Sequence, residues 1–137
     1  MKIVLDVSAA ISIATAAPGK EWVRKALIEA EEILVPDLYL AEATNAAWKF
    51  FHIEGASLQQ IQQLAKRSMD LPDHISPATD LWQDALVLAH QLDHPVYDCL
   101  YLTLAQQHEA HLLTLDKRLR RLAKKVGITL IPDPENS

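Results

Sequence analysis

Short apolar runs that end at an aspartate or a proline constrain the fold of this chain most. Residues 2–5 (Lys-Ile-Val-Leu) stop at Asp6, residues 33–36 end in a proline, and residues 111–115 (His-Leu-Leu-Thr-Leu) stop at Asp116. Each run has the length of a buried strand. Strands that are apolar throughout are typical of parallel sheets with both faces covered. The pattern therefore predicts an α/β fold, a parallel β-sheet flanked by helices on both faces.

Longer segments with helical spacing of apolar residues separate these runs. Gly55 ends one of them, and Ser57 with Gln60 forms a capping box at the start of the next. The 137 residues are enough to bury a real core, and we expect a single domain over residues 1–137 with a tail at 132–137. We expect helices over residues 8–17, 20–32, 37–54, 57–69, 78–92, 98–109 and 117–126, a weak strand at 74–76 and a last strand at 128–131.

Composition and charge narrow the class of protein. Cys99 is the only cysteine, which excludes an internal disulfide and a multi-cysteine zinc site. The N-terminus meets a charge after three apolar residues, and no apolar run reaches membrane-spanning length, so we expect a soluble, cytoplasmic protein without a membrane partner. The net charge is −5, yet six of the thirteen Lys and Arg residues lie between Lys117 and Lys125.

Four acids occupy positions that a parallel sheet brings together. Asp6 and Asp116 end strands, Asp98 lies in the first turn of its helix, and Glu42 has apolar neighbours on its helix face. Each acid alone has a structural explanation as a helix cap or an exposed residue. Together they predict a site at the carboxyl ends of the strands, where ligands bind in open α/β sheets. Clustered carboxylates without basic partners indicate a divalent cation, magnesium or manganese rather than zinc.

Four segments around these acids resemble the successive signatures of the PIN-domain family. They appear in the family's order and span essentially the whole chain. The Tyr-Asp-x-x-Tyr-x-x-x-Ala segment and the later Thr-x-Asp are the most specific of them. The segments are Val4-Leu5-Asp6-Val7-Ser8, Glu42 with Asn45, Tyr97–Ala105 and Leu113–Leu119.

The resemblance implies a magnesium-dependent endoribonuclease that cleaves single-stranded RNA, with Mn²⁺ as a substitute. Carried over by motif, the site consists of Asp6, Glu42, Asp98 and Asp116. Asp6 and Asp98 would be the principal metal ligands, and the other two acids would complete the site directly or through water. Chain length makes the protein most similar to VapC-type toxins of type II toxin–antitoxin pairs. This implies an antitoxin partner beside a single-stranded or structured RNA substrate, and we also expect a homodimer.

Further residues are candidates for supporting roles. Ser8, Asn45 and Thr114 lie two or three residues from site acids, at spacings that let them orient those acids. Each could instead serve only as a cap or a strand residue. Four cations that follow Asp116 are candidates to bind RNA phosphates, or form a solvated helix face: Lys117, Arg118, Arg120 and Arg121.

Other functions are less compatible with the sequence. A phosphatase of the haloacid dehalogenase type needs a second aspartate two residues after the first, and position 8 is serine. His90 and His94 have a spacing that could hold zinc, but they precede Pro95 at the end of a helix, where histidine favours the helix dipole. A housekeeping PIN nuclease and a non-catalytic PIN-fold binding module stay open as alternatives. Trp48 and Phe51 suggest a homodimer or antitoxin contact.

Overall fold

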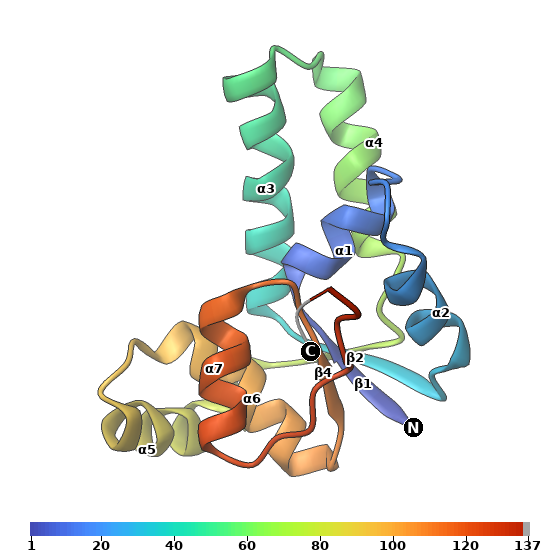
Figure 1. Cartoon of the computed structure of the whole chain (residues 1–137). Coiled ribbons are helices and arrows are strands. Elements are labelled where there is room, and N and C mark those ends of the chain that lie inside the picture. The colour runs from blue at the N-terminus through green and yellow to red at the C-terminus, as the bar shows by residue number, and fades with distance from the viewer. Residues whose placement is uncertain (136–137) are drawn as a thin grey trace.

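The computed structural model describes residues 1–135 and has a four-stranded parallel sheet at its centre (Figure 1). The strand order is β3-β2-β1-β4, and every neighbouring pair is parallel. The fold predicted from the sequence is therefore confirmed. The strands are β1 (Lys2–Leu5), β2 (Glu32–Pro36), β3 (His74–Ser76) and β4 (His111–Leu113).

The expected strand at residues 128–131 is wrong. Within the described residues this segment makes only an isolated parallel bridge, between Leu112 and Leu130. The backbone N–H of Ile131 donates a hydrogen bond to the carbonyl of Leu112, and the carbonyl of Ile131 accepts one from the buried side chain of Arg120. Pro132 follows directly and has no amide hydrogen to donate. The segment therefore lies beside β4 without extending the sheet by a regular strand.

Helices connect the strands, mostly as expected from apolar periodicity. The first helix ends three residues early, at Ala14, and Ala16 adopts a left-handed conformation just after it. The segment after Pro77 begins with a single 3₁₀ turn, Ala78–Asp80, before its helix forms. The helices are α1 (Val7–Ala14), α2 (Glu21–Glu29), α3 (Leu38–Glu54), α4 (Leu58–Met69), α5 (Trp82–Leu92), α6 (Val96–His108) and α7 (Lys117–Lys125).

Helices cover both sides of the sheet. Figure 1 shows α5, α6 and α7 on one side and α1 and α2 on the other, while the α3–α4 hairpin projects away from the sheet. Helix α6 packs directly on β1 and β2. No helix within residues 1–135 has the length and apolar character needed to cross a membrane.

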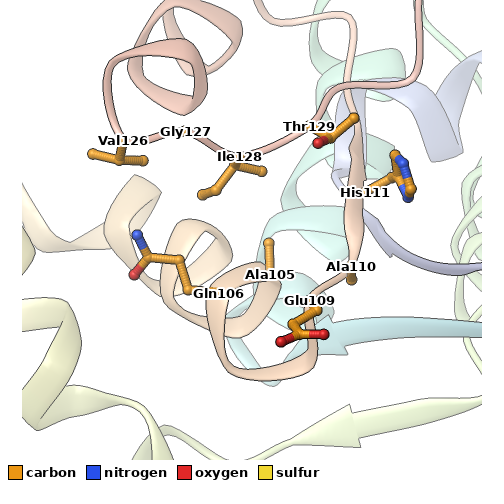
Figure 2. A pocket seen from close by; sticks show the side chains of 9 residues that line it. All are labelled: Ala105, Gln106, Glu109, Ala110, His111, Val126, Gly127, Ile128 and Thr129. Atoms are coloured by element: carbon orange, nitrogen blue, oxygen red, sulfur yellow. The ribbon is translucent and has the colours of Figure 1, made fainter.

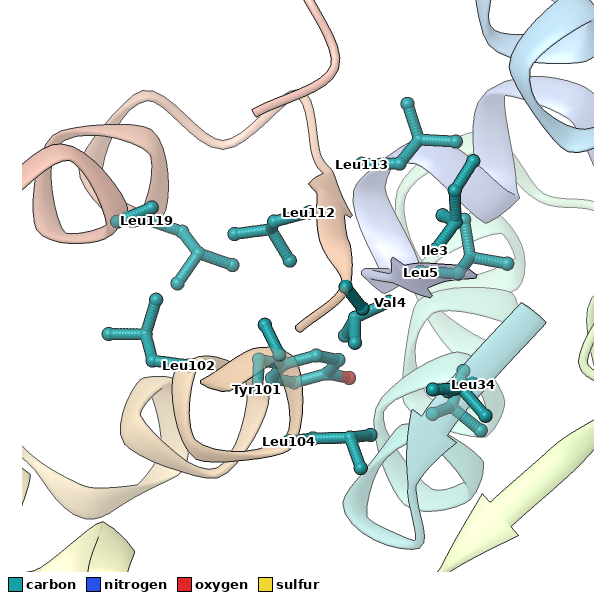
Figure 3. Close-up of a cluster of buried hydrophobic side chains, with 14 of the residues drawn as sticks. Ile3, Val4, Leu5, Leu34, Tyr101, Leu102, Leu104, Leu112, Leu113 and Leu119 are labelled. Atoms are coloured by element: carbon teal, nitrogen blue, oxygen red, sulfur yellow. The ribbon is translucent and has the colours of Figure 1, made fainter. Parts of the chain in front are cut away.

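The core consists of the apolar strands and the helix faces that cover them. Ile3, Val4 and Leu5 of β1 are completely buried, which explains why this strand carries no alternating polar residues. They pack with leucines of β4 and α6, as Figure 3 shows. Cys99 is also completely buried, as expected of a packing residue.

The strand order creates a switch point between β1 and β4. The chain leaves β1 through α1 and α2 to reach β2, whereas it reaches β4 from β3 through α5 and α6, which lie on the other side of the sheet. The helices that follow β1 and β4 therefore diverge at the carboxyl ends of these two strands. Crevices of this kind are where open α/β sheets bind ligands.

Candidate active site

Asp6 lies at the switch point, directly after β1. Its side chain is 9% exposed and caps α1 by accepting a hydrogen bond from the backbone N–H of Ser8. The same oxygen, Oδ2, accepts hydrogen bonds from the hydroxyls of Ser8 and Thr114, the latter at 2.7 Å. Within residues 1–135 no hydrogen bond reaches Oδ1. One carboxylate oxygen is thus held by three donors, and the other is left for a ligand.

The two hydroxyls also tie the ends of β1 and β4 together. Ser8 Oγ accepts a hydrogen bond from the backbone N–H of Leu115 at 2.9 Å, and Thr114 Oγ1 accepts one from the backbone N–H of Asp116 at 3.0 Å. Because each hydroxyl donates to Asp6 while it accepts from the segment after β4, the position of Asp6 depends on that segment. The structure therefore brings Ser8 and Thr114 to Asp6, at the positions that spacing suggested.

Asp116 lies at the other side of the switch point, directly before α7. Its Oδ1 accepts hydrogen bonds from the backbone N–H groups of Arg118 and Leu119 and so caps the helix. Its negative charge raises the pKa of Asp6, although burial is the larger cause of that rise. Asp116 is therefore both a helix cap and a neighbour of Asp6.

Glu42 reaches the site from α3, which starts two residues after β2. Its Oε1 accepts a hydrogen bond of 2.6 Å from the hydroxyl of Tyr101, a buried residue of α6. Burial raises the pKa of Glu42, the hydrogen bond from Tyr101 lowers it, and the charges of Asp6, Asp98 and Asp116 raise it. The other three acids thus lie close enough for their charges to act on the protonation of Glu42.

Asp98 occupies the first turn of α6 and has two cationic or polar neighbours. Its Oδ2 lies 2.8 Å from Nε2 of His94 and 3.1 Å from Nε of Arg118. The Asp98 side chain is 15% exposed, whereas that of Arg118 is 59% exposed. An exposed arginine can leave this carboxylate without disturbing the core.

His94 lies in the connection after α5 rather than at the end of the helix, so its sequence-based interpretation as a helix-end residue is wrong.

Asn45, the third residue expected to orient the acids, makes no such contact. It is exposed on α3, and its side chain forms no hydrogen bond within the described part of the chain. It lies one helical turn after Glu42. The structure thus gives no support to a positioning role for Asn45.

The four cations expected to contact RNA have different surroundings. Lys117, Arg118 and Arg121 are exposed, so their side chains can reach a ligand. Arg120 is only 9% exposed, and its Nη1 donates hydrogen bonds to the carbonyls of Thr114 and Ile131. We therefore no longer assign Arg120 to RNA binding, because its guanidinium connects α7 to the end of β4 and to the tail.

The acids form an oxygen-only donor set, which suits a hard divalent cation such as magnesium. The charges of Asp6, Asp98 and Asp116 raise the pKa of Glu42, which indicates excess negative charge that a cation would neutralise. Among the described residues, however, no three His, Cys, Asp or Glu side chains are gathered into a group that could hold a metal ion. The residues fit the cation in chemistry and charge, while Asp98 is paired with Arg118 instead.

A hollow lies at the opposite end of β4 from the acids. Its volume is about 300 Å³, and residues of α6, the start of β4 and the segment 126–129 line it (Figure 2). Glu109 and His111 are the only titratable residues among those that line it. Because it lies at the amino end of a parallel strand, it is not where ligands of such sheets normally bind.

Comparisons with known proteins establish the family of this chain. Residues 3–125 match the PIN domain family. The chain is 29% identical over 136 residues to Ribonuclease VapC3 of Pyrobaculum aerophilum, and this alignment covers 96% of the chain and 100% of the relative. The chain therefore belongs to the PIN-domain family, and the resemblance to VapC-type proteins noted in the sequence is confirmed.

Solved structures share the fold at lower identity. A toxin–antitoxin complex from Klebsiella pneumoniae matches with a TM-score of 0.68 and 17% identity, over 96% of this chain and 98% of that chain. VapBC2 from Rickettsia felis, bound to a DNA fragment from its promoter, matches with a TM-score of 0.61 and 17% identity, over 95% of this chain and 97% of that chain. At these identities the likeness establishes the fold alone.

Proposed function

We propose that this PIN-domain nuclease is a magnesium-dependent endoribonuclease that cleaves single-stranded RNA as the toxin of a toxin–antitoxin pair. The observation that supports the proposal most is the placement of Asp6 after β1 and of Asp116 before α7 at this switch point. Glu42 lies near enough for the charges of Asp6, Asp98 and Asp116 to raise its pKa. A relative named as a ribonuclease and neighbours solved as toxin–antitoxin complexes support it. Mn²⁺ would substitute for Mg²⁺, because both prefer oxygen ligands.

Asp6 and Asp98 are the residues that would hold the cation most directly, with Glu42 and Asp116 beside them. When bound, the cation supplies an activated water and neutralises charge on the scissile phosphate. Ser8 and Thr114 would keep Asp6 oriented by holding its Oδ2. Asp98 would have to exchange Arg118 for the cation, and the exposed Arg118 side chain would then be free to meet a phosphate.

Tyr101 would keep Glu42 in place through its hydroxyl. Lys117 and Arg121 are exposed near the same end of the sheet and would attract the RNA backbone toward an otherwise anionic site. We propose further that the protein acts in the cytoplasm, forms a homodimer and is restrained by an antitoxin protein.

The decisive experiment measures cleavage of a labelled single-stranded RNA by the wild type and by Asp98→Asn, with Mg²⁺, with Mn²⁺ and with a chelator. Asparagine preserves the shape of the side chain but removes the charge that binds a cation, so we expect cleavage to fall by about a hundredfold or more. The control is Asp84→Asn on the exposed side of α5, with cleavage as in the wild type. Full cleavage in chelator, or by Asp98→Asn, would refute the mechanism.

The toxin assignment needs a separate test. Expression of the wild type should arrest bacterial growth, expression of Asp98→Asn should not, and the product of the neighbouring reading frame should relieve the arrest. Cleavage in vitro without growth arrest would leave a housekeeping nuclease as the better description.

A further inference from the structure

Residues of α7, with Leu115 before it and Asp133 after Ile131, line a hollow of about 270 Å³. It adjoins the site along the chain, because Leu115 and Lys117 are the neighbours of Asp116. The residues that line it are Leu115, Lys117, Arg120, Arg121, Lys124 and Asp133.

Three exposed cations form one wall of this hollow. Lys117, Arg121 and Lys124 follow one another at intervals of four and three residues, so they share one face of α7. With a rise of about 1.5 Å per residue, their backbone positions span roughly 10 Å. Within residues 1–135 none of the three forms an ion pair. These three cations and Arg120 line the hollow together with a single acid, Asp133, and this excess of positive charge favours an anionic ligand.

Arg120, which lines the hollow, connects it to the acids through Thr114. Arg120 is 9% exposed, and its Nη1 holds the carbonyl of Thr114 at 3.0 Å and that of Ile131 at 3.3 Å. Thr114 in turn donates its hydroxyl to Asp6. The same buried residue thus connects the floor of the hollow, the tail and the end of β4. Hydrogen bonds of the buried residues Arg120 and Thr114 therefore fix the position of the hollow relative to Asp6.

We propose that this hollow binds a backbone phosphate of the RNA, next to the phosphate that is cleaved, through Lys117, Arg121 and Lys124. The identity of the ligand as RNA rests on the proposed function. A ligand that spans the proposed cation site and the hollow must carry negative charge at both. The first would present a cation among carboxylates, and the second presents lysine and arginine side chains. A phosphodiester chain has that property, and the cations would offset its repulsion by the four acids.

Binding measured without cleavage tests this proposal. The probe is a fluorescein-labelled single-stranded RNA of mixed sequence, titrated in chelator at several salt concentrations. Lys124→Gln and Lys125→Gln form a matched pair, since both residues are exposed neighbours on α7 and only Lys124 lines the hollow. The double variant in the hollow is Arg121→Gln with Lys124→Gln. The double control is Arg24→Gln with Lys125→Gln, which also removes one arginine and one lysine, at exposed positions outside the hollow.

We expect the double variant in the hollow to bind the RNA about tenfold more weakly at low salt, with the salt slope reduced by about 0.7 for one lost phosphate contact. The double control should change the affinity by less than about twofold. Equal losses in both double variants would mean that only net charge matters, and no loss in either would mean that the hollow is empty of RNA. Either result overturns the proposal. Melting temperatures check that all variants are folded.

A competition with polyglutamate separates RNA from an acidic protein segment. We expect polyglutamate not to displace the RNA at matched charge. If Arg121→Gln with Lys124→Gln weakens binding of polyglutamate but not of RNA, the occupant is a protein and the proposal fails. The outcome is distinct from a failure of the nuclease assignment, which would appear as absence of metal-dependent cleavage by the wild type whatever the binding results.

Discussion

The hydroxyl of Thr114 donates a hydrogen bond of 2.7 Å to the carboxylate of Asp6, across 108 residues of sequence. Both residues are buried, and the same hydroxyl accepts the backbone N–H of Asp116. One side chain therefore contacts two acids that follow different strands.

Thr114→Val should lower stability and cleavage together. The substitution keeps the side-chain shape but removes the donor to Asp6 and the acceptor for Asp116, which costs about 1–3 kcal/mol for buried polar groups left without partners. The matched control is Thr103→Val, because Thr103 is completely buried and its Oγ1 has no hydrogen-bond partner in the described residues. Chemical denaturation should show a loss for Thr114→Val and no loss for Thr103→Val. Equal losses would contradict the role given to the Thr114 hydroxyl.

Glu42→Gln should stabilise the metal-free protein at neutral pH. The pKa of Glu42 is raised, first by burial, so folding favours its protonated form. The stability from this group is complete below the unfolded-state pKa of about 4.3 and is lost as pH rises through the folded-state pKa. Glutamine mimics the protonated form, so we expect a Tm about 3 °C above the wild type at pH 8 in chelator.

The difference between Glu42→Gln and the wild type should disappear near pH 4, where both side chains are neutral. Glu54→Gln, at the exposed end of the same helix, serves as the control and should not move the Tm at pH 8. Thermal melts across this pH range decide the matter, and a gain at pH 8 that persists unchanged at pH 4 would show that charge is not its cause.

Tyr101→Phe should move the pH dependence of cleavage. Its hydroxyl donates to Glu42 and lowers the pKa of that acid, so its removal lets the pKa of Glu42 rise further. We expect the acidic limb of the pH–rate profile to shift to higher pH. Tyr39→Phe is the matched control: Tyr39 is also a buried tyrosine, but its hydroxyl donates to the carbonyl of Ser68. Both variants should lose stability, and a shift of the limb in both would contradict the prediction.

Trp48 and Phe51 should lie in a contact with a second copy or with the antitoxin. Their side chains are 46% and 51% exposed on α3, and Trp48 stacks on His52 at 4.8 Å. Aromatic residues of this kind are enriched at protein interfaces. We expect Trp48→Ala with Phe51→Ala to reduce the mass seen by light scattering or to abolish capture of the co-expressed antitoxin.

The control for this contact is Trp82→Ala with Leu86→Ala, which removes similarly exposed apolar residues from α5. If the α3 variant keeps both the assembly state and the antitoxin while the α5 variant loses one of them, the interface lies on α5 instead.

The sequence predicted the position of Asp6 and Asp116 after the ends of β1 and β4, because a strand period and its end determine where a side chain meets the sheet edge. Thr114 followed from the same period of two. The surroundings of Asp98 could not be predicted in this way, since Arg118 reaches it from a helix twenty residues later in the sequence. Whether an arginine on α7 faces solvent, as Arg118 does, or the core, as Arg120 does, depends on how that helix packs.

The sequence carried a partial signal for the structural roles of Arg120 and Tyr101. Arg120 lies one turn before Ala123, on the edge of the buried face of α7, which hinted at a structural role. Tyr101 stands in the most specific motif, but only the folded structure reveals that its hydroxyl meets Glu42 of α3. The catalytic role of the four acids stays a prediction until it is measured.

The pairing of β1 with β4 has a consequence for synthesis of the chain on the ribosome. Asp6 emerges early, but the strand and the hydroxyl that hold it in place come from residues 111–114. A nascent chain that lacks this late segment therefore carries isolated acids and no assembled site. We therefore expect a nuclease built in this order to stay inert throughout most of its translation.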